Sequence, residues 1–208
     1  MSEVVVNTRR MGLRDIYVAK VTENTPTKYT TETPIKLGRA ISAKVTVKKS
    51  IEKIYSDDNI EEIIESFESA ELEIENNKLS PEQKALLRGA TYENGFLVNN
   101  ANDKAAEIAI GWRAKQTNGK YEFVWYYCGK FNQGQTEDYD TNGDKTKTQT
   151  SKLKGTFYQR QKDENYNIEV DESYLATEET EAKEAIKSWF SKVQELVQKS
   201  VKTEKLNA

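Results

Sequence analysis

The stretch KAAEIAIGWRAKQTNGKYEFVWYYCGKF, residues 104–131, predicts an antiparallel β-hairpin and, with it, a mainly β fold. Two runs rich in β-branched and aromatic residues flank Asn118-Gly119, a dipeptide typical of two-residue hairpin turns because both residues tolerate positive φ. A turn of that length places Trp112 opposite Trp125, on one face of the hairpin. The predicted core of the hairpin consists of Ile110, Trp112, Phe123, Trp125 and Tyr127.

Residues 121–131 are apolar on both faces of the predicted strand. An aromatic row at the period of a strand can stack bases or sugars, but it is more typical of a buried face, and no basic stripe accompanies it. The other face carries Val124, Tyr126 and Cys128, so we expect a helix or a neighbouring subunit to cover it. With no histidine and no second cysteine in the chain, Cys128 is predicted to be a small buried hydrophobe.

The composition excludes several classes of function. The chain has 208 residues, 31 Lys and Arg against 34 Asp and Glu, one Cys and no His, which gives a formal net charge of −3. This length suits one domain with a substantial core. The charge gives no basic footprint for tight nucleic-acid binding. Without histidine the commonest general base and the usual zinc ligands are missing, so we expect no enzyme, no cofactor and no disulfide.

The N-terminal segment is not expected to be a signal peptide. Its apolar run is three valines at 4–6, preceded by Glu3 and followed by Arg9-Arg10, which is too short for the apolar region of a leader. No window reaches the roughly 18 apolar residues of a membrane-spanning helix. We therefore expect a protein of an aqueous compartment that does not insert into membranes.

Other segments have assignable secondary structure. Alternating patterns predict strands at 15–23, 40–55, 69–77, 152–160 and 165–170. Residues 56–69 fit both a polar loop and a short helix. Apolar residues at helical spacing, with acids first and lysines last, predict a second helix within 177–200.

A short helix at 80–89 is predicted from its boundary residues. Ser80 has the properties of an N-cap, Pro81 suits the first helical position, and Gln83 completes a capping box. Gly89 is suited to end the helix, since glycine readily takes the left-handed conformation found at helix C-termini.

One segment has the spacing of metal ligands. Asp138, Asp140 and Asn142, followed by Gly143, match the first half of a calcium-binding loop. The twelfth position holds Gln149 in place of the bidentate glutamate, and no helix pair flanks the loop. We therefore predict no metal site, with Asp138, Asp140 and Asn142 as the candidates if one exists.

Several stretches, taken together and in this order, resemble the major tail proteins of long-tailed bacteriophages, in particular the phi13-type group found in phages of Gram-positive bacteria. They are MGLRDIYVAKVTENT, YSDDNIEEIIESFESAELEIE, LSPEQKALLRGATYENGFLVNNAND, GKYEFVWYYCGKF, QTSKLKGTFYQR and the late WF. The chain departs from the group in its longer basic tail after Val193 and in having a cysteine at Cys128.

The resemblance implies a tail-tube fold, a β-sandwich or open barrel of antiparallel strands with an extended arm and flanking helix 80–89. Residues 1–175 would form this domain and residues 176–208 a C-terminal helical segment and tail. The strand at 40–55 and the loop at 130–152 are the two candidates for the arm.

It further implies a structural protein that forms stacked rings, six copies to a ring, making a tube through which DNA is ejected. The implied partners are further copies of the chain and the tape-measure, tail initiator and tail terminator proteins. The implied location is the virion tail, and the host cytoplasm during assembly.

A row of glutamates is the candidate lining for such a tube. Glu71, Glu73 and Glu75 share one face of the strand at 69–77, and an acidic wall would repel passing DNA. Lys44 and Lys48 form a similar stripe one strand earlier, so neutralisation across the strands is the alternative. The alternative for the whole chain is a monomeric β-sandwich module that binds calcium or carbohydrate.

Overall fold

The computed structural model describes residues 7–132, 135–137, 139, 141 and 150–196. Its elements, in chain order, are β1 (Arg10–Asn24), β2 (Tyr29–Thr31), β3 (Ile35–Lys36), β4 (Ala40–Ser56), β5 (Asn59–Asn76), α1 (Pro81–Arg88), β6 (Thr91–Glu93), β7 (Phe96–Val98), β8 (Ile108–Gln116), β9 (Tyr121–Lys130), β10 (Gln135–Glu137), β11 (Ser151–Tyr158), β12 (Asn167–Asp171) and α2 (Thr180–Lys187). The predicted mainly β class is confirmed, and the five predicted strands correspond to β1, β4, β5, β11 and β12.

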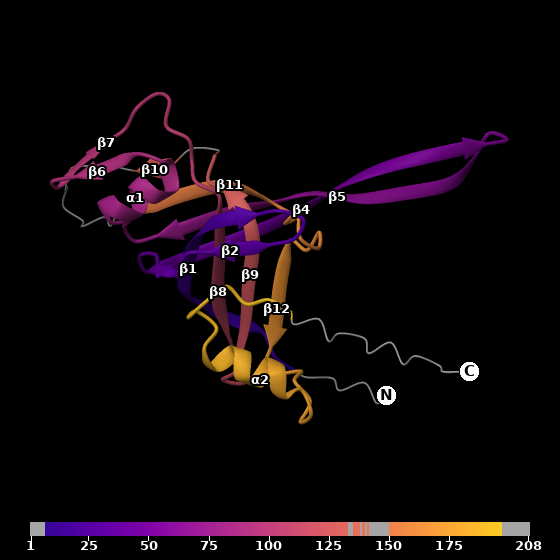
Figure 1. Cartoon of the computed structure of the whole chain (residues 1–208). Helices are drawn as coiled ribbons and strands as arrows, with labels where there is room; N and C mark the ends of the chain where they lie inside the picture. The colour runs from indigo at the N-terminus through magenta and orange to yellow at the C-terminus, as the bar shows by residue number, and fades with distance from the viewer. Residues whose placement is uncertain (1–6, 133–134, 138, 140, 142–149, 197–208) are drawn as a thin grey trace, which may run out of the picture.

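One large antiparallel sheet organises the molecule (Figure 1). Its strands follow the order β2-β1-β8-β9-β11-β5-β4, with β3, β10 and β12 pairing at the sides, while β6 and β7 form a small separate hairpin. The sheet curls, so that Ala43 and Val45 of β4 pack on the same core as Trp112 of β8 and Val124 of β9. In the part of the chain that the structure describes, β1 and β4 do not pair, and the curled sheet is an open barrel.

The β8–β9 hairpin is buried on both faces, because a second core lies outside the barrel. The C-terminal segment covers that outer face with Trp189 and Val193, which pack with Phe123, Trp125 and Tyr127. The indole Nε1 of Trp125 donates to the Trp189 carbonyl at 3.2 Å. Both faces of the hairpin are therefore covered by parts of the chain itself.

The predicted hairpin register is wrong by one residue. The structure pairs Trp112 with Val124 and Gly111 with Trp125. The loop has three residues, because the amide of Gln116 donates to the carbonyl of Lys120 and only Gly119, at φ 85°, has positive φ. This is the arrangement of a type I turn followed by a left-handed glycine, which replaces the expected two-residue turn.

A one-residue change of register moves side chains to the opposite face of a sheet. All five predicted core residues of the hairpin are buried, but they belong to two cores. Ile110 and Trp112 face the barrel interior, together with Val124 and Tyr126. The C-terminal segment packs in one cluster with Phe123, Trp125, Tyr127 and Cys128. The prediction that Val124, Tyr126 and Cys128 need an added cover is therefore wrong for Val124 and Tyr126, which lie in the barrel core.

The helix α1 has the boundaries that its residues predict. Ser80 accepts from the amide of Gln83, and the Gln83 side chain accepts from the amide of Ser80, which completes the capping box. Gly89 ends the helix at φ 75°, and a Cβ there would lie 2.0 Å from the Lys104 carbonyl oxygen. The position therefore requires glycine for its conformation and for the close approach of the 99–107 loop.

The predicted C-terminal helix is too long. The helix α2 ends at Lys187, and residues 188–196 continue without regular helix. Side chains occupy the carbonyls that a continuing helix would use: Trp125 donates to the Trp189 oxygen, and the Gln194 amide donates to the oxygens of Ser188 and Trp189. Burial of Trp189 against the sheet therefore replaces the next helical turn.

A buried arginine joins this segment to the sheet. The Arg160 side chain is 1% exposed, and it donates to both carboxylate oxygens of Asp163 and to Glu195 at 2.7 Å. Its guanidinium lies 4.0 Å from the Tyr127 ring centroid and 5.0 Å from that of Tyr29. Carboxylates and aromatic faces together compensate a charge that would otherwise be costly to bury.

Acid should weaken this arrangement. The hydrogen bonds from Arg160 lower the pKa of Asp163. A carboxylate with a lowered pKa stabilises the fold above its unfolded pKa of about 3.9, and this contribution is lost as pH falls through the lower folded value. We expect the free energy of unfolding, measured in urea, to fall below about pH 4. Arg160→Met should show a shallower acid dependence, and identical dependences in both proteins would contradict this role of Asp163.

Candidate functional site

The most conspicuous feature of the surface is an arm formed by the outer halves of β4 and β5. The two strands leave the barrel and run as a two-stranded ribbon to a distant tip (Figure 1). Asp57 and Asp58 form a two-residue turn there, with φ of 49° and 62°, between the paired residues Ser56 and Asn59. Aspartate tolerates the left-handed region, which this hairpin turn requires. Residues 59–69, within the segment that fitted both loop and helix, are a strand.

One face of the arm is apolar and exposed. The register places Ile51, Tyr55, Ile60 and Ile63 on the same side of the ribbon, together with Lys53 and Glu65. The four apolar residues are 59%, 63%, 48% and 53% exposed. Val45 lies on the same side of β4, and there it packs against the barrel core. The core-facing side of the β4–β5 ribbon therefore continues beyond the barrel, where nothing in the described chain covers it.

The arm is also acidic. Residues 49–66 contain six acids and two lysines, a net charge of −4. Because the whole chain carries −3, the remaining residues carry +1. The arm thus combines an apolar face with a strongly negative rim.

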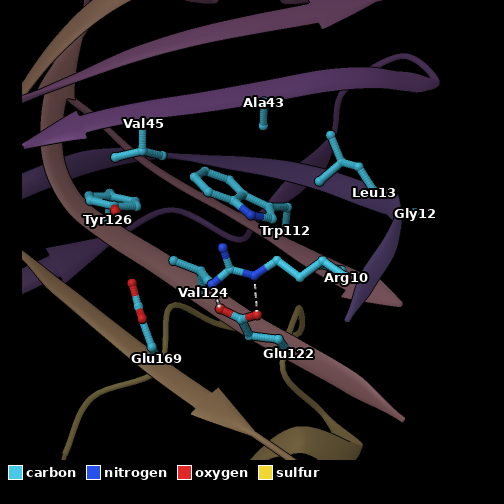
Figure 2. A pocket seen from close by; sticks show the side chains of 11 residues that line it. Arg10, Gly12, Leu13, Ala43, Val45, Trp112, Glu122, Val124, Tyr126 and Glu169 are labelled. Atoms are coloured by element: carbon cyan, nitrogen blue, oxygen red, sulfur yellow. Dashed lines mark hydrogen bonds and ion pairs between the residues drawn. The ribbon is translucent and has the colours of Figure 1, made fainter. Parts of the chain in front are cut away.

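A cavity of about 330 Å³ opens at the mouth of the barrel, where β1 and β4 face each other unpaired (Figure 2). Its walls include Trp112, stacked on Tyr126 with ring centroids 5.6 Å apart. Arg10 donates from Nε and Nη2 to the two carboxylate oxygens of Glu122. Burial raises the pKa of Glu169, a further wall residue, and the negative charge of the nearby Glu122 adds a smaller rise in the same direction. The cavity therefore joins apolar walls to a compensated ion pair and an exposed acid whose pKa is raised.

The predicted row of glutamates lies on the outer face of the sheet and is neutralised. Glu71 pairs with Lys48 at 2.5 Å and Glu73 with Lys154 at 3.2 Å. Glu75 accepts hydrogen bonds from the hydroxyls of Thr150 and Ser42. The register also sets Lys44 opposite Glu73 and Lys152 opposite Glu75. Three acids thus alternate with four lysines on this face. Neutralisation across the strands describes it better than an acidic wall.

This neutralisation leads to a prediction about DNA. Replacing Glu71, Glu73 and Glu75 by glutamine would leave four lysines uncompensated on one face, and we expect DNA binding to appear, with a log–log salt slope of up to about −4. Fluorescence anisotropy of a labelled duplex at several salt concentrations measures it. The matched control is Glu61→Gln/Glu62→Gln/Glu65→Gln, the same charge change on the arm. Equal binding by the two variants would contradict the prediction.

The candidate calcium ligands Asp138, Asp140 and Asn142 lie outside the described residues. Among the residues that are described, no three carboxylate or cysteine side chains gather as a metal ion would need. The described helices include none that is long and apolar enough to cross a membrane.

Sequence reasoning found the long strand of the arm but missed its partner and the cavity. In β5 the adjacent Ile63 and Ile64 break the alternation, and irregular pairing near Glu61 shifts it again. The available signal was the pair Asp57-Asp58, a turn dipeptide between two runs that contain isoleucine. The cavity has no local signal, because its walls come from five strands distant in sequence.

The comparisons with known proteins are sparse. No family model matches the chain, and no curated protein matches it. Among solved structures, the chain is similar to a chain of the 6-fold symmetrised cryo-EM structure of the anti-feeding prophage (AFP) baseplate. The sequence identity is 9%, the similarity covers 82% of this chain and 97% of that chain, and the TM-score is 0.39.

Proposed function

We propose that this chain is a structural subunit that self-assembles into the tail tube of a long-tailed phage. The observation that carries the proposal is the apolar face of the β4–β5 arm, with Ile51, Tyr55, Ile60 and Ile63 all about half exposed or more. An isolated two-stranded ribbon is marginal in water, and exposed apolar surface of this kind marks an interface. The arm is therefore built to lie on another molecule.

The resemblance to major tail proteins supplies the finer part of the proposal. Copies of the chain, six to a ring, would stack into a tube through which DNA leaves the virion. The tape-measure, initiator and terminator proteins would set its length and ends. The buried faces of the hairpin and the absence of histidine agree with a structural role, since the described chain presents no paired nucleophile and base.

We further propose that the sheet face with Glu71, Glu73 and Glu75 lines the lumen, for a reason that differs from simple repulsion. That face also carries Lys44, Lys48, Lys152 and Lys154. Uncompensated lysines would bind phosphates and retard DNA. The glutamates neutralise them and leave a polar wall to which DNA has little affinity.

Negative-stain microscopy of the concentrated protein tests this function. Rings or tubes of uniform width are the expected result. A protein that stays monomeric at every concentration, and whose thermal unfolding temperature rises with added calcium, would instead indicate the binding module. Microscopy of the Glu→Gln triple variant then shows whether the lining face affects assembly separately from DNA binding.

A further inference from the structure

The mouth of the barrel carries an excess of negative charge. Arg10 binds the carboxylate of Glu122, whereas Glu169, on the neighbouring β12, accepts a hydrogen bond from a neutral amide. The register sets Asp171 opposite Glu122, and Asp171 also accepts from neutral donors. Within the described part of the chain, one cation therefore stands against three carboxylates on this side of β9 and β12.

An occupant that suits this site combines positive charge with apolar side chains. The cavity of about 330 Å³ has the apolar walls Leu13, Trp112 and Val124 (Figure 2), and a concave site of this kind buries most of a side chain that enters it. Burial and then the charge of Glu122 raise the pKa of Glu169, and a cation nearby favours the ionised form. A cationic segment with an aliphatic side chain therefore fits the mouth, and an acidic segment does not.

The chain contains such a segment outside the described residues. Residues 197–208, VQKSVKTEKLNA, hold three lysines against Glu204, a net charge of +2, and an isolated leucine, Leu206. We refer to them as the basic tail. Because the whole chain carries −3, residues 1–196 carry −5. The basic tail is thus opposite in charge to the rest of the molecule, and the proposed function assigns it no role.

The basic tail starts close enough to the mouth to reach it. The carboxylate of Glu195 accepts from Lys162 at 2.8 Å, and the chain from Lys162 to Glu169 along β12 spans at most about 25 Å. Among the described strands β12 pairs with β9 alone, so its other edge leaves a path to the face of Glu169. Twelve extended residues span about 40 Å, which is enough to pass that edge.

The arm is the competing acidic surface, and it suits the basic tail less well. Its apolar side chains stand on an open ribbon (Figure 1), which buries less of a bound side chain than a cavity does. Lys53 lies on the same side of the ribbon, and Glu65 there is already bound by Lys49 at 3.0 Å. The mouth offers both the concave apolar walls and the carboxylates that lack a cation.

We propose that residues 197–208 bind the barrel mouth of their own chain. Leu206 lies against the apolar walls, and Lys202 and Lys205 lie beside the carboxylates of β12. The contact is within one molecule, so it goes beyond the proposed function and does not depend on it. It makes the basic tail a cover for the apolar walls of the mouth.

Crosslinking within single chains tests the contact. Asn207→Cys is combined with Ala114→Cys, on the cavity wall, in a Cys128→Ala background, and the monomer is treated with a short bis-maleimide. The matched control combines Asn207→Cys with Gly12→Cys. Gly12 pairs with Lys115, beside Ala114, and so presents its side chain to the other face, where an added Cβ meets nothing within 4 Å. We expect the cavity pair to react about tenfold faster, because binding raises the effective concentration.

Each other outcome overturns the contact or its intramolecular character. Equal rates at the two positions, or no crosslink at either, would rule out binding at the mouth. Crosslinks between separate Asn207→Cys and Ala114→Cys chains in a mixture would assign the mouth to the tail of another copy. If Ala114→Cys lowers the urea midpoint, Leu13→Cys on the same wall repeats the measurement. All rates are measured on monomer, so they stand whether or not rings appear by microscopy.

A charge exchange gives a second readout. Glu169→Lys should slow the cavity crosslink about fivefold, and adding Lys205→Glu in the same chain should restore it. Glu61→Lys, the same charge change on the arm, is the control and should leave the rate unchanged. The effect of Glu169→Lys should shrink at high salt, which screens exposed charges. Failure of Lys205→Glu to restore the rate would contradict the pairing of the basic tail with β12.

Discussion

Replacing Ile51 and Ile63 by serine is expected to abolish self-assembly while leaving the folded monomer intact. Each isoleucine contributes about 2 kcal/mol when it is fully buried at an interface. Losing both contributions should raise the concentration needed for assembly roughly a thousandfold, since about 1.4 kcal/mol corresponds to a factor of ten. Sedimentation velocity over a range of concentrations measures the change.

The matched control lies on the other face of the same ribbon. Ile54 and Ile64 are 37% and 44% exposed, and their serine variants alter composition and strand propensity to the same degree. We expect them to assemble far better than the Ile51/Ile63 variant. All four substitutions are at exposed positions, so each should change the free energy of unfolding by less than about 0.5 kcal/mol. Equal assembly by the two double variants would contradict the assignment of the apolar face.

How far the sequence predicts this fold is clearest in its turns. Asn94-Gly95 and Asn118-Gly119 carry the same dipeptide. In the first, both residues have positive φ and form a two-residue turn. In the second only Gly119 does. The dipeptide alone cannot distinguish these cases.

Contacts from distant segments distinguish them. The amide of Thr117 donates to the carbonyl of Arg9, the residue before β1, and the Asn118 amide group donates to the Ser173 hydroxyl. These contacts hold the longer loop in place, and the longer loop sets the register of the hairpin. For this reason the mainly β class, the positions of the strands and the buried residues could be predicted from neighbouring residues in the sequence. The placement of Trp112 and Trp125 in two different cores could not, because it depends on contacts from distant segments.

The same distinction applies to the candidate site. The glutamate row was predictable from alternation, because Glu71, Glu73 and Glu75 are every second residue of one strand. Its neutralisation depends on Lys48 and Lys154, which reach it from both neighbouring strands. The arm combines two segments whose pairing follows from the Asp57-Asp58 turn, and the barrel mouth requires the curl of the entire sheet. Predictability thus decreases as a feature draws on more distant parts of the chain.

Replacing Arg160 by alanine should destabilise the protein more than any surface change. The substitution removes a side chain that is 1% exposed, leaves Asp163 and Glu195 without their main partner, and opens a space beside Tyr127. Breaking a buried ion pair on one side costs about 3–5 kcal/mol. Because Asp163 and Glu195 keep 17% and 30% exposure, water can solvate them in part, and we expect the lower end of that range.

The position of Arg160 also determines how the loss should appear. Its bond to Glu195 holds the C-terminal segment over Trp125, so tryptophan fluorescence should shift to longer wavelength before global unfolding in urea. Arg113→Ala is the matched control, because Arg113 also pairs with an aspartate, Asp15, and lies over an aromatic ring, that of Tyr121. Its side chain is 34% exposed, so its removal should cost about 1 kcal/mol or less. Equal losses from the two variants would contradict burial as the source of the effect, because the two arginines differ chiefly in their access to water.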